Sequence, residues 1–210
     1  MSLDFASALG AVTRSVTDTE RDGAPAKVVT LARAYDTSAE DLWDAATNPE
    51  RLPRWFAPVT GDFRPGGKYQ IKGNASGTIT ACEPPRRLDL TWEFGGGVSW
   101  VELRLSPEAA GRTRLSLSHI CPVDEFWSQY GPGAGGVGWD LAMLGLSLHA
   151  SDPDWERFDE EAFATSPEGI AFITGAGRDW GRAAAASGED PGQAKAAADR
   201  TIAFYTGQQA

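Results

Sequence analysis

The chain has 210 residues, and 29 acidic against 19 basic side chains give it a formal net charge of −10. Because a domain typically takes about 100–200 residues, the length predicts one large domain or one domain with an extension. The acidic balance disfavours nucleic acid as a partner, since nucleic-acid sites need basic side chains to neutralise phosphates. For the same reason it disfavours binding to an anionic membrane surface.

The cysteines and the N-terminal residues indicate a cytoplasmic protein. Cys82 and Cys121 are too few for a disulfide framework, and neither belongs to a CxxC pair. The apolar stretch at 5–12 has no basic segment before it, unlike a secretory signal peptide. The sequence contains no uncharged apolar run of about 18 residues, the length that a membrane-spanning helix needs.

The first quarter of the chain predicts helices and strands after a polar segment. Residues 4–13 favour a short helix, with a strand soon after it and a turn at 20–25. β-Branched and apolar residues at 28–35 predict a further strand. Residues 37–40 (TSAE) have the pattern of a capping box, which starts a helix by satisfying its free amide groups. A second short helix is expected next, with an inner face formed by Leu52, Trp55 and Phe56.

After Pro58 the spacing of apolar residues changes from helical to alternating, which is typical of strands with one buried face. On one such run, Leu88, Leu90, Trp92 and Phe94 fall on the same side. Glycine and proline bound the runs, as they do in hairpins. The predicted strands, which together form an antiparallel meander, are 59–64, 68–72, 77–83, 87–94, 98–106 and 113–121.

The remaining residues predict helices. A short helix at 123–130, a break at the glycine-rich run 131–138 and a long helix at 137–150 follow the strands. The long helix is apolar on nearly all sides, so an element besides the sheet must cover it. Residues 152–210 are the expected cover, with three helices, two of which begin at Ser-Pro and Asp-Pro pairs. The predicted organisation is an N-terminal segment at 1–26, a domain at 27–151 and a helical extension at 152–210.

Several motifs resemble those of one family. They are residues 43–56 (WDAATNPERLPRWF), 63–69 (FRPGGKY), 83–92 (EPPRRLDLTW), 113–119 (TRLSLSH) and the pair Gly138-Trp139. In this order they are similar to the activator of heat-shock-protein-90 ATPase homologue-like domains. These belong to the START and birch-pollen-allergen (SRPBCC) superfamily, together with polyketide cyclase-like proteins. The resemblance implies an α+β helix-grip fold, in which a curved antiparallel sheet wraps around a long C-terminal helix, here with a helical extension.

The resemblance also implies a ligand cavity between the sheet and the long helix. Apolar walls with a few polar groups are typical of small-molecule sites. We expect Trp55, Trp92 and Trp139 to supply contact area, and Tyr69 and His119 to orient polar ligand atoms. The alternative is that these side chains fill an ordinary core. The predicted ligand-binding residues are Trp55, Phe56, Tyr69, Trp92, Leu103, Leu117, His119, Trp139 and Met143.

Other chemistry-bearing residues favour structural interpretations. His119 is a polar group on an apolar face, and a core histidine bonded to neighbouring groups is the simpler interpretation. His149, near the end of the long helix, suits the helix dipole with a partial positive charge. Cys121 is not expected to act as a nucleophile, and the run 131–136 matches GxGxxG without the strand that a dinucleotide site requires. The acidic residues at 152–161 favour a solvated helix start over a calcium loop.

The predicted function is non-catalytic binding of a small hydrophobic or aromatic molecule, with no cofactor, metal or catalytic residue. One alternative is a protein-interaction or co-chaperone-like module, with a partner protein or a second copy of the chain bound through 152–210 or through the face that carries Trp100. The other is a polyketide cyclase- or aromatase-like enzyme, in which Tyr69 and His119 transfer protons. No nucleic-acid or membrane partner is expected.

Overall fold

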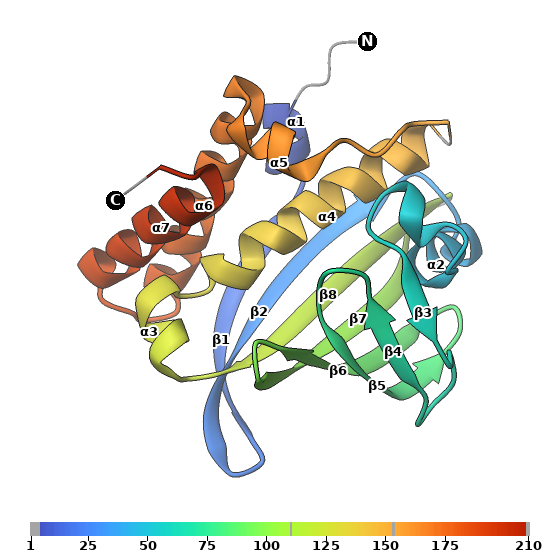
Figure 1. Ribbon diagram of the computed structural model, residues 1–210, viewed down its shortest axis with the longest axis horizontal. Helices are drawn as coiled ribbons and strands as arrows, with labels where there is room; N and C mark the ends of the chain where they lie inside the picture. Colours follow the sequence, from blue (N-terminus) through green and yellow to red (C-terminus); the bar gives the residue numbers. More distant parts are fainter. Residues whose placement is uncertain (1–4, 110, 153, 209–210) are drawn as a thin grey trace. The chain divides into compact units, whose positions relative to one another are not determined.

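The computed structural model describes residues 5–109, 111–152 and 154–208, which form an α+β structure with one eight-stranded sheet (Figure 1). The strand order is β1-β2-β8-β7-β6-β5-β4-β3, and the neighbouring pairs from β8 to β3 are antiparallel. The strands are β1 (Thr13–Arg21), β2 (Ala24–Tyr35), β3 (Val59–Gly61), β4 (Lys68–Ile71), β5 (Ser76–Glu83), β6 (Arg87–Phe94), β7 (Gly97–Ala109) and β8 (Arg112–Pro122). This architecture confirms the predicted helix-grip class.

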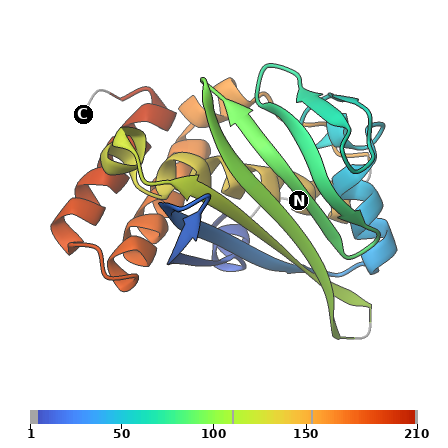
Figure 2. The same cartoon turned by 90° about the horizontal axis from the view of Figure 1, so that it is seen from below.

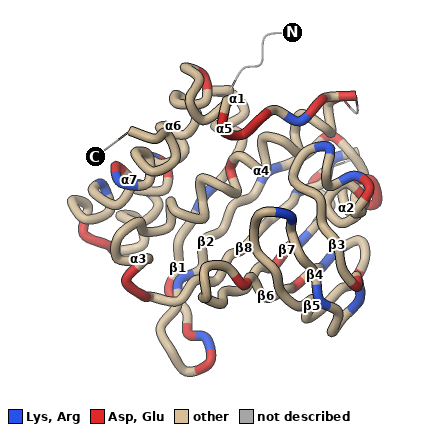
Figure 3. The backbone as a smooth tube through the Cα atoms, in the orientation of Figure 1, with Lys and Arg blue, Asp and Glu red and all other residues tan. Residues whose placement is uncertain are grey.

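The described residues also include seven α-helices and one 3-10 helix. They are α1 (Phe5–Gly10), α2 (Ala39–Thr47), η1 (Leu52–Arg54), α3 (Glu125–Tyr130), α4 (Gly133–Ser151), α5 (Glu160–Thr165), α6 (Pro167–Ala186) and α7 (Pro191–Thr206). Among these residues, none of the helices is long and apolar enough to cross a membrane. The long helix α4 carries a single Asp, Glu, Lys or Arg, which is Asp140. Its tube is accordingly drawn mostly in the tan of uncharged residues (Figure 3).

Spatial contacts divide the chain into two compact units. Unit 1 contains the described residues up to Leu31, the segment Cys121–Leu141 and the residues from Phe158 onward. Unit 2 contains Ala32–Ile120 and Ala142–Arg157. Both units therefore take residues from β2 and α4. The sequence-based boundaries after residues 26 and 151 follow the chain rather than these contacts, and they remain predictions.

The strand register in unit 2 brings apolar residues of three neighbouring strands to the same face. Leu103 pairs with Leu88 of β6 and with Leu117 of β8, and Val101 pairs with His119. Because side chains alternate between the faces of a sheet, the intervening residues point to the opposite face. The strands drawn in green twist strongly along their length (Figure 2). The alternation in the sequence predicted this face and β6 correctly.

Local capping groups set the start of helix α2. Ser38 is the N-cap, and its hydroxyl accepts a hydrogen bond from the amide of Asp41 at 3.2 Å. The helix start was therefore predicted, but the capping box was placed one residue too early: the N-cap is Ser38 rather than Thr37, and the hydroxyl of Thr37 instead donates to the carboxylate of Asp41 at 2.8 Å. The second short helix is only the 3-10 turn η1.

The prediction that the glycine-rich run is entirely a break is wrong. Gly131 ends α3 with a φ of 59°, but α4 begins at Gly133 and includes the remaining glycines. A methyl group on Gly136 would lie 2.4 Å from the ring of Trp180, so glycine at this position lets the indole lie directly on the helix backbone. These glycines serve close packing within unit 1.

The helices of unit 1 begin where the sequence indicates. Ser166 caps α6 and Asp190 caps α7, each followed by proline at the first helical position. Within this unit, Arg14 of β1 forms an ion pair with Asp140 of α4 at 2.6 Å. The indole N–H of Trp180 donates to the same carboxylate at 2.9 Å. The interior of unit 1 is thus closed by a bonded polar network as well as by apolar packing.

Candidate functional site

Unit 2 brings together most of the predicted ligand-binding residues. Tyr69, Leu103, Leu117, His119 and Met143 are buried there. Trp55, Phe56 and Trp92 belong to the same unit and are half-buried. Trp139 is also half-buried but belongs to unit 1, so it is not placed with the others.

Strand β6 has an unusual burial pattern. Leu88, Leu90 and Trp92 on the apolar side are only half-buried, whereas Asp89 between them is buried, with 9% of the residue exposed. Asp89 accepts hydrogen bonds from Arg87 at 2.6 Å and from Arg104. Burial works to raise the pKa of Asp89, but the hydrogen bonds from both arginines hold it below its usual value. Asp89 itself is therefore more completely buried than the apolar residues on either side of it.

The half-buried apolar residues surround a small buried cluster. Tyr69, Ile71 and Ile79 form its core. The partly buried residues that pack against it are Phe56, Ala57, Val59, Cys82, Leu88, Leu90 and Trp92. Because an ordinary filled core buries such side chains almost completely, this surface has apolar area left to cover.

His119 lies on the same face and has a defined hydrogen-bonding state. The hydroxyl of Ser99 donates to the carbonyl of Trp92 at 3.2 Å and lies 2.8 Å from Nε2 of His119. Since a hydroxyl has one proton, Ser99 must accept from an Nε2–H group, which leaves Nδ1 as the acceptor nitrogen of the neutral ring. Burial lowers the pKa of His119 to about 4. The ring also contacts Trp92, with centroids 6.1 Å apart.

Tyr69 is fixed by a backbone contact. Its hydroxyl donates to the carbonyl of Thr91 at 2.7 Å, and burial, followed by the charge of Glu93, raises its pKa above the ordinary value. At neutral pH, Tyr69 is therefore a neutral phenol and His119 a neutral imidazole. Burial, followed by the charge of Asp124, raises the pKa of Cys121 to about 12, so this thiol is also protonated. These groups suit neutral hydrogen bonding rather than proton transfer.

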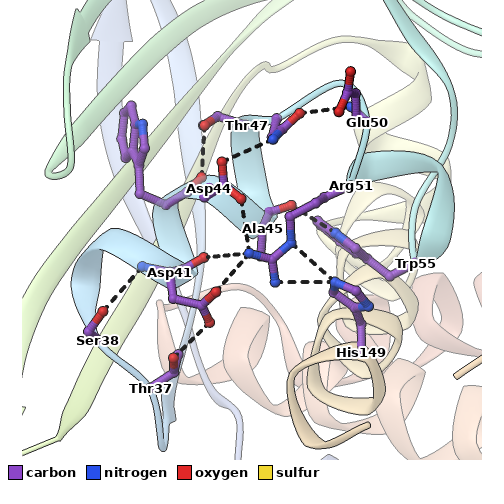
Figure 4. Close-up of polar contacts among 12 residues, drawn as sticks. Thr37, Ser38, Asp41, Asp44, Ala45, Thr47, Glu50, Arg51, Trp55 and His149 are labelled. Atoms are coloured by element: carbon purple, nitrogen blue, oxygen red, sulfur yellow. Dashed lines mark hydrogen bonds and ion pairs between the residues drawn. The ribbon is translucent and has the colours of Figure 1, made fainter. Parts of the chain in front are cut away.

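A polar cluster that the sequence did not predict joins α2, η1 and the last turn of α4 (Figure 4). Arg51 donates to Asp41 at 2.7 Å and to Asp44 at 3.0 Å. Two further nitrogens of the same guanidinium lie 3.3 and 3.4 Å from Nε2 of His149. The separation of these residues in the chain gives no local spacing signal that could have revealed the cluster.

The predicted cap-like role of His149 is wrong. The side chain is 1% exposed, and burial, together with the charges of Arg51 and Arg54, lowers its pKa. His149 is consequently a neutral acceptor of Arg51 rather than a cation at the helix end.

The acidic segment before α5 has a capping role. Asp159 is the N-cap of α5, where its carboxylate accepts from the amide of Ala162 at 2.9 Å. Within the described ranges, no group of three or more His, Cys, Asp or Glu side chains is arranged to hold a metal ion.

Comparison with known families agrees with this fold. The family model described as "Activator of Hsp90 ATPase homolog 1-like protein" matches residues 36–143, slightly more than half of the chain. The chain belongs to this family. The resemblance predicted from the sequence motifs is thereby confirmed. No curated protein matches the chain.

Several solved structures are similar to this family member. CalU16 from Micromonospora echinospora is 32% identical, and its crystal structure aligns over 82% of this chain and 98% of that chain with a TM-score of 0.67. Its solution structure aligns over 84% and 97%, at the same identity, with a TM-score of 0.71. A conserved protein of unknown function from Enterococcus faecalis, EF2215, is 16% identical over 98% of this chain and 96% of that chain, with a TM-score of 0.56. That last alignment extends the shared fold beyond the residues that the family model matches.

Proposed function

We propose that this protein binds a small hydrophobic or aromatic molecule, without chemical change, on the apolar face of the unit 2 sheet. The observation that carries the proposal is the half-burial of Leu88, Leu90 and Trp92 beside a buried Asp89. A bound apolar molecule would remove the remaining area from water, at about 25 cal/mol for each Å².

The polar groups on this face indicate how such a molecule would be recognised. His119 and Tyr69 are neutral and already hold defined hydrogen bonds, so neither offers a charge to an ionic ligand. An uncharged molecule with a planar apolar body suits Trp92 and Phe56, because aromatic rings supply a large contact area with specific stacking geometry. Binding of this kind needs no cofactor.

Substitution of Trp92 tests the proposal, with Trp100 as a matched control. Both tryptophans lie on adjacent strands, but Trp100 pairs with Thr91 and therefore occupies the opposite face of the sheet. We expect Trp92→Ala to weaken binding of the uncharged fluorescent probe N-phenyl-1-naphthylamine about tenfold, equivalent to about 1.4 kcal/mol. Trp100→Ala should leave the affinity within about twofold.

Titrations would use protein whose near-ultraviolet circular dichroism shows intact tertiary packing, since loosely packed states also bind this probe. Equal weakening by both substitutions, or no saturable binding by the native protein, would contradict the proposal. Native mass spectrometry of protein purified from its own host would identify a retained molecule by its added mass.

A second candidate function is association with another copy of the chain, and an aromatic surface of unit 1 favours it. Phe126 is 61% exposed and Phe204 is 70% exposed. Tyr130 lies between them, with ring centroids 5.0 Å from Phe126 and 5.9 Å from Phe204. Contiguous exposed aromatic side chains are typical of protein contact surfaces.

Sedimentation equilibrium tests this second candidate. If the surface mediates self-association, the native protein forms dimers that the double variant Phe126→Ser and Phe204→Ser converts to monomers. Phe94→Ser removes another exposed aromatic side chain, in unit 2, and should not alter the oligomeric state. A native protein that is monomeric at every concentration would contradict self-association through this surface.

A further inference from the structure

Arg51 connects two helices of unit 2 through one guanidinium group. It precedes η1 as the N-cap residue of that turn. On one side it binds the carboxylates of Asp41 and Asp44 in α2, and on the other it lies against Nε2 of His149 in α4 (Figure 4). One guanidinium group thus contacts both helices, and its contact with α4 is made through Nε2 of His149.

The chemistry of the two groups fixes the protonation state of this contact. A guanidinium only donates hydrogen bonds and remains charged at every physiological pH. Nε2 of His149 must therefore carry the lone pair, which places the proton of the neutral ring on Nδ1. That Nδ1 atom is buried, and among the residues that the structure describes it has no hydrogen-bond partner. A second proton would have to bind Nε2, where it would face the guanidinium of Arg51 and meet no acceptor.

A second contact holds the same segment against the same face of α4. Gly145 lies one helical turn before His149, and residues four apart share a helix face. A methyl group on Gly145 would lie 2.5 Å from the carbonyl oxygen of Trp55, so the backbone at Trp55 rests directly on α4. The indole N–H of Trp55 donates to the carbonyl of Ala45 in α2 at 2.9 Å. The close contact between Trp55 and Gly145 and the hydrogen-bond acceptor on His149 thus both hold η1 against α4.

We propose that the Arg51–His149 pair is an acid-sensitive latch, which holds η1 and the following Trp55 and Phe56 against α4. Protonation removes the acceptor lone pair and places a second cation against Arg51, with Arg54 also nearby. The repulsion is relieved when Arg51 moves away and keeps only its carboxylate partners in α2. If Trp55 and Phe56 border a bound ligand, release of the segment in acid would also open the ligand site. This part of the inference rests on the proposed function.

The other charged groups around His149 do not titrate in the same range. Asp41 and Asp44 of α2 have pKa values lowered by their hydrogen bonds from Arg51, so both stay ionised while a histidine gains its proton. Guanidinium groups in general keep their charge over the whole physiological range. Of the groups from α2, η1 and α4 that face the pair, only His149 changes its charge under mildly acidic conditions.

Hydrogen exchange of the full chain tests the latch without any ligand. The amide of Phe56 donates to the carbonyl of Leu52 at 2.8 Å, and its protection reports whether η1 is docked. After correction for intrinsic rates, protection should fall about tenfold between about pH 7 and pH 5 in the native protein. His149→Gln keeps an acceptor but cannot titrate, so its protection should stay constant. His119→Asn leaves the latch intact and should retain the native pH dependence.

Arg51→Met provides an independent variant if His149→Gln does not fold, and it should show low, pH-independent protection already at neutral pH. An equal loss of protection in native protein and His149→Gln, or no loss in the native protein, would overturn the latch. Probe binding, measured separately with the uncharged N-phenyl-1-naphthylamine, distinguishes this failure from failure of the proposed ligand site. A native protein that loses protection in acid but never binds the probe retains the latch and rejects the ligand site.

Discussion

Helix α4 carries one buried ionisable residue in each unit, and their surroundings differ sharply. Asp140 in unit 1 is charge-paired with Arg14 at 2.6 Å and also accepts from Trp180. His149 in unit 2 receives two longer contacts from Arg51, and its Nδ1 has no partner among the described residues. The carboxylate of Asp140 is thus paired with an opposite charge, whereas the contact between Arg51 and His149 depends on the single lone pair of Nε2.

The tryptophans show the same difference. Trp180 of unit 1 is fully buried, and its indole N–H is bonded to Asp140. Trp92 of unit 2 is half-buried on an apolar face. Regions that bind ligands or change conformation generally have fewer buried apolar contacts and more exposed hydrogen bonds than the rest of a protein. The surroundings of Trp180 in unit 1 are therefore more complete than those of Trp92 in unit 2, which agrees with the ligand binding proposed for unit 2.

The largest expected effect comes from removing the buried ion pair between Arg14 and Asp140 in unit 1. Arg14→Met removes all the guanidinium hydrogen bonds to Asp140 and leaves a buried carboxylate without its countercharge. Loss of one partner of a buried pair typically costs about 3–5 kcal/mol, which urea denaturation would measure. Arg182→Met removes an exposed arginine that pairs with Asp179 and should cost less than about 0.5 kcal/mol. A loss below about 1 kcal/mol for Arg14→Met would contradict the distinction between the units.

Acidification is expected to weaken unit 2 selectively, because both histidines of the chain lie there. The pKa of His119 is about 4 in the folded protein against 6.5 as its ordinary value, so the unfolded chain binds the proton more readily. The stability from neutral His119 is complete above about pH 6.5 and is lost as the pH falls toward 4, by about 3 kcal/mol in total.

Urea denaturation at several pH values would measure this dependence. His119→Gln should flatten it, and His149→Gln should remove a further share, since the pKa of His149 is also lowered. A pH dependence that is identical in native protein and His119→Gln would contradict the assignment.

The sequence predicted those parts of the fold that local patterns encode. Alternation located β6, and Ser-Pro and Asp-Pro pairs located the starts of α6 and α7, because capping and strand periodicity act over a few residues. Glycine in 133–138 was misinterpreted as a helix break. The real role of these glycines is close packing across long sequence separations, as at Gly136 against Trp180, and local propensity contains no information about such contacts.

The candidate site was predictable only in part, for the same reason. Strand alternation placed Trp92, Leu103, Leu117 and His119 on one face. The pairing of Arg51 with His149 depends on how η1 meets α4, and no spacing rule connects residues so far apart. Burial and the neighbouring arginines lower the pKa of His149, whereas the helix-dipole argument favours the protonated ring and therefore predicted the wrong charge state.

Two helix glycines sharpen the comparison between the units by their different neighbours. A methyl group on Gly145 would lie 2.5 Å from the backbone oxygen of Trp55, whereas one on Gly175 would meet the end of the flexible Leu9 side chain. We expect Gly145→Ala in unit 2 to cost about 1–3 kcal/mol through overpacking. Gly175→Ala in unit 1 should be neutral or stabilising by up to about 1 kcal/mol, because alanine favours helix.

Thermal denaturation and amide exchange at Phe56 would separate these outcomes. Gly145→Ala should lower the protection of η1, and Gly175→Ala should not. Similar destabilisation by both substitutions would show that helix glycines, rather than the close approach at Trp55, determine the effect.

The smallest expected effect concerns the bonded groups of the apolar face itself. Ser99 donates to the carbonyl of Trp92 and accepts from Nε2–H of His119, so Ser99→Ala removes two hydrogen bonds next to the proposed ligand. We expect a loss of about 1 kcal/mol in unfolding free energy, which is typical for neutral hydrogen bonds. The pKa of His119 should fall further, because the hydrogen bond to Ser99 stabilises the imidazolium more than it stabilises the neutral ring. Ser116→Ala, on the opposite face of β8 from Leu117, should change neither quantity. A pKa of His119 that stays constant in Ser99→Ala, measured by NMR titration, would mean that Ser99 does not hold the Nε2–H tautomer.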